Sequence, residues 1–268
     1  MVRVGLVGCG TIGSQLARAI EQKYGQVARV VALHDANRAH ASSLQRRLTT
    51  HPIICSLPAL IRTSHLVIEA ASAAVAAEVV RRALRAHRDV MVMSVGGLLD
   101  DRSWQRLARR SRGRVYIPSG ALAALDGIRA MAVGRIRRVS LTTRKPPKAL
   151  ADAPYVRRKG LRLKRLTRPS LIFEGSPREV VRAFPQNTNV AAALALSSGV
   201  SGTRARIRVI ADPTIRTNIH ELEVEGDCGL IHCRIQSRPS ANPKTSELAV
   251  RSSIATLQRL FDPVVVGT

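Results

Sequence analysis

Apolar residues in the first half of the chain recur in short runs that alternate with segments of helical periodicity. The runs are rich in Val, Ile and Leu and are bounded by glycine or polar residues, which is typical of buried parallel strands. The predicted strands cover residues 2–8, 28–35, 65–72, 89–97 and 114–120, and the predicted helices cover 14–25, 37–48, 73–87 and 100–111. This alternation predicts an α/β fold with a doubly wound parallel sheet of the Rossmann type.

The pattern changes after residue 125. An exposed strand is predicted over 135–147, a short strand and helix over 170–175 and 177–184, and a helix of small residues over 187–198. Three consecutive strands follow at 204–213, 217–226 and 229–238, with Gly226, Asp227 and Gly229 suited to a hairpin turn. An amphipathic helix is predicted over 242–261, with Ser246 or Thr245 near its start. We expect an α+β region with a mostly antiparallel sheet.

A glycine-rich segment joins the first predicted strand to the first helix. It reads Gly8-Cys9-Gly10-Thr11-Ile12-Gly13, a G-x-G-x-x-G motif in the strand-to-helix position that dinucleotide-binding folds require. Gly8 permits a tight turn, Gly10 lets a pyrophosphate approach the backbone, and Gly13 lets strand and helix pack closely. The free N–H groups of the helix start would face the phosphates.

The second predicted strand ends at Asp35, 22 residues beyond Gly13. An acid there would accept hydrogen bonds from the adenosine ribose and repel a 2′-phosphate, which favours NAD over NADP. Arg38 would soften that preference by pairing with the phosphate, and Asp35 would alternatively serve as the N-cap of the next helix. The other strands end in small or polar residues, among them Ala71 and Ser72, and ligands bind at such ends.

The 268 residues therefore suggest two domains and a returning helix. Residues 1–120 would form a dinucleotide-binding Rossmann domain, and residues 121–240 an α+β domain with the substrate and catalytic groups. Residues 241–268 would form a C-terminal helix that packs back on the first domain. A nucleotide domain joined to a second sheet suggests an oxidoreductase of two domains.

Composition argues against several classes of protein. Apolar residues make up 45% of the chain, but no run of about 18 of them indicates a membrane span. The first residues enter a strand directly and lack the features of a secretory signal, so we expect a cytoplasmic location. Cys9, Cys55, Cys228 and Cys233 form no C-x-x-C pair, and His232 and Cys233 would face opposite sides of a strand. We expect reduced thiols and no metal site.

The net charge of +25 is the unusual property of the chain. Arginine supplies 37 of the 43 basic residues, with the densest run over 157–168. Such a charge attracts polyanions at low salt, but no nucleic-acid motif accompanies it and aromatic residues are only 3% of the chain. We expect no specific nucleic-acid partner, and an arginine-biased composition unrelated to function explains the charge equally well.

Two polar residues stand out in the predicted strand 217–226. Asn218 and His220 are two positions apart and so share one face of the strand. A histidine that faces a bound nucleotide would act as general acid or base near neutral pH. The alternative is a solvated strand face or a structural histidine.

Eight segments, in order, resemble one family over nearly the whole chain. They read VGLVGCGTIG, VIEAAS, MSVGGL, IPSGALAALDGI, TRKPP, IFEGSPREVVRAFPQNTNVAA, DPTIRTNIHELEVEG and NPKTS. The chain resembles the L-aspartate dehydrogenase family. The resemblance implies hydride transfer from L-aspartate to NAD or NADP, giving iminoaspartate and then oxaloacetate and ammonia, or the reverse reductive amination. Iminoaspartate also feeds NAD biosynthesis in this family.

The resemblance implies roles for four residues. The family's catalytic histidine falls on His220, and its cofactor contacts fall on Ala121 and on either Asn187 or Asn189. From the residues alone, Asn218 and Lys244 are candidates for the substrate's carboxylates, because an amide offers N–H donors and an ammonium a positive charge. The alternatives for these two are a polar strand-face residue and a solvated charge at a helix start. The basic segment 157–168 departs from the family pattern.

Two other functions stay open. The chain would alternatively act on another amino acid or imine, or would bind nucleotide or polyanion without catalysis. An exposed edge of the second sheet would pair between subunits, so we expect a homo-oligomer, and a homodimer as its simplest form.

Overall fold

We describe a computed structural model of the chain, which covers residues 1–185, 189–200, 205–240, 246–264 and 266. The chain forms two compact units. The first combines Met1–Pro118 with Ser253–Val264, and the second comprises Ser119–Ser252. The division between them falls at Pro118 and again inside the last helix, α11 (Glu247–Phe261).

The first unit is built on a parallel sheet of six strands in the order β3-β2-β1-β4-β5-β6. The strands are β1 (Val2–Val7), β2 (Ala28–His34), β3 (Ile53–Ile54), β4 (Leu66–Glu69), β5 (Asp89–Val92) and β6 (Val115–Tyr116). Their buried Val, Leu and Ile side chains explain why both faces need helices. The predicted Rossmann-type parallel sheet is confirmed. The pair formed by β3 and α3 (Leu57–Thr63) was not predicted.

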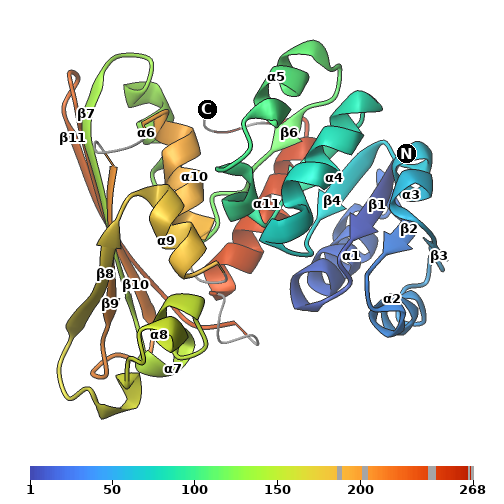
Figure 1. Ribbon diagram of the computed structural model, residues 1–268. Coiled ribbons are helices and arrows are strands. Elements are labelled where there is room, and N and C mark those ends of the chain that lie inside the picture. The colour runs from blue at the N-terminus through green and yellow to red at the C-terminus, as the bar shows by residue number, and fades with distance from the viewer. Residues whose placement is uncertain (186–188, 201–204, 241–245, 265, 267–268) are drawn as a thin grey trace. The chain divides into compact units, whose positions relative to one another are not determined.

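Helices cover this sheet on both faces (Figure 1). The helices of the unit include α1 (Thr11–Tyr24), α2 (Arg38–Gln45), α4 (Ala73–Arg85) and α5 (Ser103–Arg110). Leu16 of α1, Leu44 of α2 and Leu257 of α11 share one apolar cluster with the strands. The rings of Tyr24 and Phe261 lie 5.4 Å apart, so the end of α11 packs beside α1.

The predicted strand over 89–97 is wrong in its second half. The strand ends at Val92, and a 3-10 turn, η1 (Val95–Leu98), follows. A Cβ on Gly97 would lie 2.1 Å from the carbonyl oxygen of Ala73, so the backbone here turns to pack closely on the start of α4. A continuous strand would prevent that approach. The predicted strand over 65–72 likewise ends early, at Glu69.

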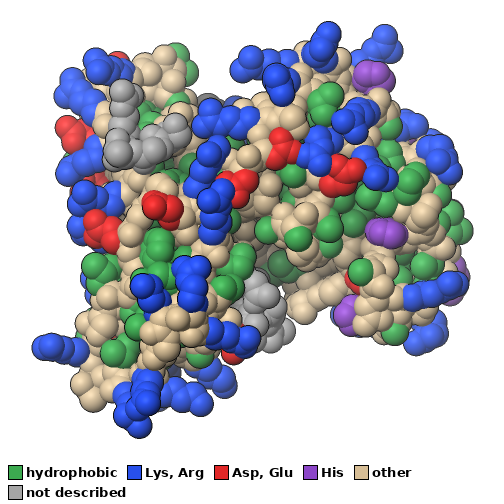
Figure 2. Space-filling view, viewed as in Figure 1, with side chains coloured by type: hydrophobic (Ala, Val, Ile, Leu, Met, Phe, Trp, Pro, Cys, Tyr) green, Lys and Arg blue, Asp and Glu red, His purple; other side chains and the backbone are tan. Residues whose placement is uncertain are grey.

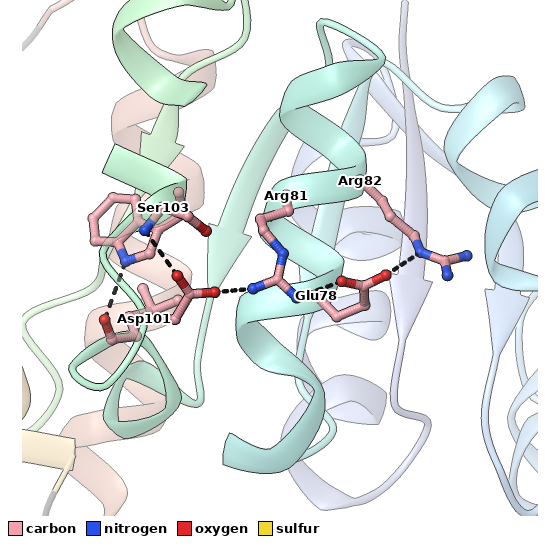
Figure 3. Close-up of polar contacts among 7 residues, drawn as sticks. Glu78, Arg81, Arg82, Asp101 and Ser103 are labelled. Atoms are coloured by element: carbon pink, nitrogen blue, oxygen red, sulfur yellow. Dashed lines mark hydrogen bonds and ion pairs between the residues drawn. The ribbon is translucent and has the colours of Figure 1, made fainter. Parts of the chain in front are cut away.

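A small ion-pair network links α4 to the start of α5. Arg81 lies between Glu78, at 2.5 Å on its own helix, and Asp101, which precedes α5 (Figure 3). The second carboxylate oxygen of Asp101 accepts a hydrogen bond of 2.8 Å from the Ser103 N–H. These contacts orient the first turn of α5 against α4.

The second unit contains a sheet of five strands in the order β11-β10-β7-β9-β8. The strands are β7 (Ile136–Lys145), β8 (Ser170–Gly175), β9 (Ala205–Ala211), β10 (Asn218–Gly226) and β11 (Leu230–Ser237). Only the β7–β9 pairing is parallel, so the predicted mostly antiparallel sheet is confirmed. The predicted hairpin joins β10 to β11.

The strand predicted over 135–147 is present as β7, but the prediction that it is exposed is wrong. β7 is the central strand of the sheet, with β10 on one side and β9 on the other, and one of its faces is buried. Because β9 pairs with β7, it does not neighbour β10, although the two strands are consecutive in the sequence. Arg138 and Arg144 of β7 pair with Glu223 and Glu221 of β10 on the opposite face, and such charged residues made the whole strand look exposed in sequence.

Helices lie over one face of this sheet (Figure 1). They include α6 (Leu125–Met131), α9 (Pro177–Ala183) and α10 (Asn189–Ser198), with α7 (Pro147–Leu150), α8 (Pro154–Arg158) and the 3-10 turn η2 (Leu163–Arg165) nearby in sequence. The core beneath them includes Val139, Leu141, Phe184, Leu194 and Leu222. None of the described helices is long and apolar enough to cross a bilayer.

Candidate active site

The glycine-rich loop of the first unit has the geometry of a nucleotide-binding turn. Gly8 has φ +93°, and a Cβ there would lie 2.5 Å from the backbone of Ala70. A Cβ on Gly13 would lie 2.0 Å from the carbonyl oxygen of Gly8. Any other residue at these positions would push the loop away from β4 or α1 away from the loop.

The start of α1 fits a phosphate group. Gly10 is the N-cap and no side chain caps the helix. A Cβ on Gly10 would have nothing within 4 Å, so space is open above the loop. Thr11 and Ile12 begin the helix, where the first N–H groups lack intrahelical acceptors. Free N–H donors, the positive end of the helix dipole and open space together fit the pyrophosphate of a dinucleotide.

Asp35 follows β2 and faces the glycine-rich loop. Its carboxylate accepts hydrogen bonds from the N–H of Cys9 at 2.7 Å and of Asn37 at 2.8 Å. The alternative interpretation of Asp35 as the N-cap of α2 is wrong, since Asn37 caps that helix. Arg38 is the exposed first residue of α2. Burial, with the charge of Asp35, raises the pKa of the Cys9 thiol to about 12, so this cysteine is unreactive.

Glu69 is a residue that the sequence analysis missed. It ends β4 and is 0% exposed. Its two carboxylate oxygens accept hydrogen bonds from the Ala71 N–H at 2.9 Å and the Ser94 N–H at 3.0 Å. Burial raises the pKa of this carboxyl, and the hydrogen bonds from Ser94 and the 71–72 backbone oppose that rise. The available signal was an acid at the end of an otherwise apolar strand. Ala71 and Ser72, the predicted cofactor contacts, are exposed beside it.

In the second unit, His220 lies on β10 and is 2% exposed. It pairs across the sheet with Thr143 of β7, and its Nδ1 lies 3.0 Å from Thr143 Oγ1. Burial first, and the charge of Lys145 second, lower the pKa of His220 to about 3. The imidazole is therefore neutral at physiological pH, with a threonine hydroxyl fixing the orientation of its ring.

Asn218 shares that face, as predicted, and the solvated-face interpretation of the pair is wrong because Asn218 is only 1% exposed. Neither its amide oxygen nor its amide nitrogen has a hydrogen-bond partner within the described part of the chain. Asn218 pairs with Ser237 of β11, and the Ser237 hydroxyl also lacks a hydrogen-bond partner within the described part of the chain. Buried polar atoms of this kind call for a ligand or water.

Lys145 is a second residue that the sequence analysis missed. It lies two positions after Thr143 on β7, so both side chains project from the same face of the sheet. Lys145 is 4% exposed, and burial lowers the pKa of its ammonium to about 8. Its segment, TRKPP, was noted in sequence only for the family resemblance. No local pattern distinguishes this buried lysine from a solvated one.

The remaining predicted site residues have separate positions. Ala121 is buried in the apolar core of the second unit, and Asn189 is the half-buried first residue of α10. Asn187 and Lys244 lie outside the described residues. The structure thus brings His220, Thr143, Lys145, Asn218 and Ser237 onto one sheet face, and groups the glycine-rich loop with Asp35 in the other unit.

Two family models match the chain, over two successive parts of the sequence. Residues 126–260 match the family model described as aspartate dehydrogenase, C-terminal, and residues 8–118 match that of the homoserine dehydrogenase NAD-binding domain. The fold resembles the crystal structure of an aspartate dehydrogenase from Thermotoga maritima, with a TM-score of 0.73, 23% identity and full coverage of both chains.

Curated relatives match over the full length. The chain is 43% identical to an L-aspartate dehydrogenase of Methanosarcina barkeri, with 100% of both chains covered. It is 36% identical to an L-aspartate dehydrogenase of Bradyrhizobium diazoefficiens, covering 100% of this chain and 94% of the relative. Identity at this level over whole chains, together with the matching C-terminal family model, establishes that the chain belongs to the L-aspartate dehydrogenase family.

Proposed function

We propose that this chain is an NAD(P)-dependent L-aspartate dehydrogenase in which the first unit binds the dinucleotide and the second supplies the substrate-binding and acid–base groups. The observation that carries the proposal is the buried His220–Thr143 pair, beside Asn218 and Ser237 side chains that have no partner among the described residues, in a chain whose full-length relatives are named L-aspartate dehydrogenases.

The residues of the first unit fit a pyridine dinucleotide. When bound, the nicotinamide accepts a hydride from Cα of the amino acid. The free N–H groups at Thr11 and Ile12 hold the pyrophosphate over Gly10, and Asp35 accepts hydrogen bonds from the adenosine ribose. Since a 2′-phosphate would meet the Asp35 carboxylate, NAD is the favoured cofactor, and the exposed Arg38 permits some use of NADP.

His220 performs the acid–base work. Oxidation of the amine gives an imine, and water that attacks the imine must lose a proton. The neutral imidazole accepts that proton and later returns one to the departing ammonia. A base with a pKa near 3 is weak, but the pKa of His220 is low partly because of Lys145. A substrate carboxylate beside Lys145 offsets that charge and raises the basicity of the histidine when it is needed.

Other contacts follow in part from the family resemblance, for Ala121 and the two asparagines of the 187–189 segment, and in part from the residues themselves. Ala121 and Asn189 or Asn187 contact the cofactor, with Ala71 and Ser72 at the end of β4 beside it. Asn218 donates its amide N–H groups to the substrate, which would give partners to an amide that has none among the described residues. Lys244 is the remaining candidate for the substrate's carboxylates.

The chain also assembles as a homodimer in this proposal. β8 and β11 are the edge strands of the five-stranded sheet, and each exposes a large apolar side chain, Leu171 and Leu230. Strand edges of this kind pair with other chains unless they are covered. Sedimentation of the purified protein at several concentrations measures the assembly directly.

The test is the absorbance of reduced nicotinamide with L-aspartate and either NAD+ or NADP+, for the wild type, His220→Ala and His232→Ala. His232 is an exposed histidine of β11 and serves as the matched control. We expect turnover by the wild type with a higher kcat/KM for NAD+. We expect a loss of about 10²- to 10⁴-fold in kcat for His220→Ala, the usual contribution of general acid–base catalysis. His232→Ala should retain full activity.

Binding of NADH, followed by its fluorescence, shows whether the His220→Ala protein is folded. A folded variant with wild-type turnover removes His220 from the mechanism. A wild type that binds NADH but is inert with aspartate, in both directions of the reaction, overturns the choice of substrate. A panel of other amino acids would then be the next measurement.

A further inference from the structure

The helix-covered face of the five-stranded sheet changes from apolar to polar along its strands. Leu222 of β10 pairs with Leu141 of β7. Two residues away on each strand, and so on the same face, His220 pairs with Thr143. Extending the same antiparallel register past Ile219–Arg144 places Asn218 opposite Lys145. On its other side Asn218 pairs with Ser237 of β11. An ammonium, an amide and a hydroxyl therefore form one row across three neighbouring strands, next to the acid–base histidine.

This row is buried, and two of its three members, Asn218 and Ser237, carry side-chain polar atoms without a hydrogen-bond partner among the described residues. Lys145, Asn218 and Ser237 are 4%, 1% and 7% exposed. Both polar atoms of Asn218 and the hydroxyl of Ser237 have no hydrogen-bond partner among the described residues. Buried polar atoms nearly always have partners in folded proteins, because leaving them unpaired costs stability. Several such atoms of Asn218 and Ser237 in one row indicate a place for a polar ligand rather than a packing defect.

The chemistry of the row identifies the ligand class. The lysine ammonium and the asparagine amide are hydrogen-bond donors, the serine hydroxyl can also donate, and the net charge of the three groups is positive. A carboxylate has two acceptor oxygens and one negative charge, so it complements all three groups at once. Side chains two positions apart on a strand are about 7 Å apart, so a carboxylate held here lies within a small molecule's length of His220.

We propose that Lys145, Asn218 and Ser237 bind a carboxylate of the substrate and thereby hold the reacting carbon beside His220. This inference rests on the proposed function and adds to it a carboxylate subsite in which Lys145 and Ser237 bind the substrate directly, together with Asn218. Lys145 also couples binding to chemistry, because the arriving negative charge cancels the repulsion that Lys145 exerts on a protonated His220.

The test compares Lys145→Met with Lys148→Met, since Lys148 is an exposed lysine three residues further along the chain. Methionine keeps most of the side-chain volume and removes the charge. We expect the KM for L-aspartate to rise at least about tenfold in Lys145→Met, as loss of a charge-assisted hydrogen bond implies. The KM for NAD+ should change less than about twofold, and Lys148→Met should match the wild type. Ser237→Ala should raise the KM for aspartate by a smaller factor.

A second measurement does not need catalysis. Succinate, a dicarboxylate without the amine, should raise the melting temperature of the wild-type NADH complex and of Lys148→Met, but not that of Lys145→Met. If succinate stabilises only proteins with Lys145 while aspartate is not oxidised, the carboxylate subsite stands and the proposed activity fails. If aspartate is oxidised but Lys145→Met keeps the wild-type KM and the succinate response, the subsite is overturned.

L-asparagine distinguishes the two carboxylates of aspartate. It keeps the α-carboxylate and carries an amide at the side chain. If the row binds the side-chain carboxylate, Lys145→Met loses the wild-type preference for aspartate over asparagine. If it binds the α-carboxylate, both substrates weaken equally and the preference persists. Both results support the subsite, whereas an unchanged KM for both substrates contradicts it.

Discussion

His220 is held neutral by its surroundings. Its ring is buried on β10, one nitrogen is paired with the Thr143 hydroxyl, and Lys145 adds a repulsive positive charge. Each of these features disfavours the imidazolium or fixes the ring. In the proposed mechanism, His220 would therefore depend on an anionic substrate to restore its basicity, which would tie proton transfer to substrate binding.

The same environment predicts a dependence of stability on pH. The pKa of His220 falls from 6.5 to about 3 on folding, so between these values the unfolded chain binds a proton that the folded chain does not. The free energy of unfolding therefore decreases as the pH falls through this window, by at most about 1.4 kcal/mol per pH unit from this group. Urea unfolding at pH 7 and pH 5 should show a smaller loss of stability for His220→Asn than for the wild type.

His232→Asn is the matched control, since this exposed histidine should leave the wild-type loss between pH 7 and pH 5 unchanged. If the wild type and His220→Asn lose the same unfolding free energy between pH 7 and pH 5, the pKa of His220 is not lowered in the folded chain. The carboxylates of the protein contribute equally to all three proteins and cancel in the comparison.

At the scale of elements, the nucleotide-binding edge depends on a buried carboxylate. The carboxylate of Glu69, at the end of β4, accepts hydrogen bonds from the backbone N–H groups of Ala71 and Ser94. These residues lie in segments that follow the neighbouring strands β4 and β5. Both segments lie at the carboxyl ends of parallel strands, where ligands of such sheets bind. Glu69 is therefore a positioning residue that shapes the binding edge without being exposed to the cofactor itself.

Glu69→Gln should weaken cofactor binding. Glutamine has a single acceptor oxygen, and its amide N–H group would meet a backbone N–H, so one of the two loops loses its partner. We expect the Kd for NADH to rise about tenfold and the stability to fall by about 1–3 kcal/mol, the cost of an unsatisfied buried group. The kcat at saturating cofactor should change much less, because Glu69 acts through binding.

Glu78→Gln provides the comparison for this measurement, since Glu78 pairs with Arg81 and Arg82 at the surface of α4. Surface ion pairs contribute about 0–1 kcal/mol, so this variant should bind NADH as the wild type does. If Glu69→Gln keeps the wild-type Kd while its stability falls, Glu69 has only a structural role.

At the scale of the whole molecule, the chain carries a large excess of positive charge, with a formal net charge of +25. On the face seen in Figure 2, Lys and Arg side chains are scattered rather than gathered in one patch, and they outnumber Asp and Glu. Some arginines form ion pairs with glutamates on neighbouring strands of the five-stranded sheet, such as Arg138–Glu223 at 2.7 Å and Arg208–Glu174 at 2.8 Å. With 43 basic and 18 acidic residues, most of the charge remains uncompensated.

Such a surface should bind polyanions without sequence preference. We expect double-stranded DNA to bind at low salt and the affinity to fall by orders of magnitude between about 50 and 200 mM salt, because binding releases condensed counterions. Fluorescence anisotropy with two unrelated DNA sequences measures this. An affinity that differs between the sequences, or that persists at high salt, would instead indicate a specific nucleic-acid site.

The sequence alone determined the features that depend on local chemistry. Strand–helix alternation and the glycines of the loop identified the parallel sheet and its nucleotide edge, because a turn with positive φ at Gly8 and a close approach at Gly13 admit no other residue. The shared face of Asn218 and His220 followed from the two-residue period of a strand. These signals lie within a few residues of one another along the chain.

Only the tertiary structure decided what is buried and what meets across strands. β7 carries arginines that predict an exposed strand, yet it is the central strand of its sheet, between β9 and β10, and its Lys145 is only 4% exposed. Glu69 acquires its role from Ser94, 25 residues away, and Asn218 meets Ser237 through the register of β10 with β11. Burial and cross-strand pairing arise from segments distant in sequence, so no local pattern carries them.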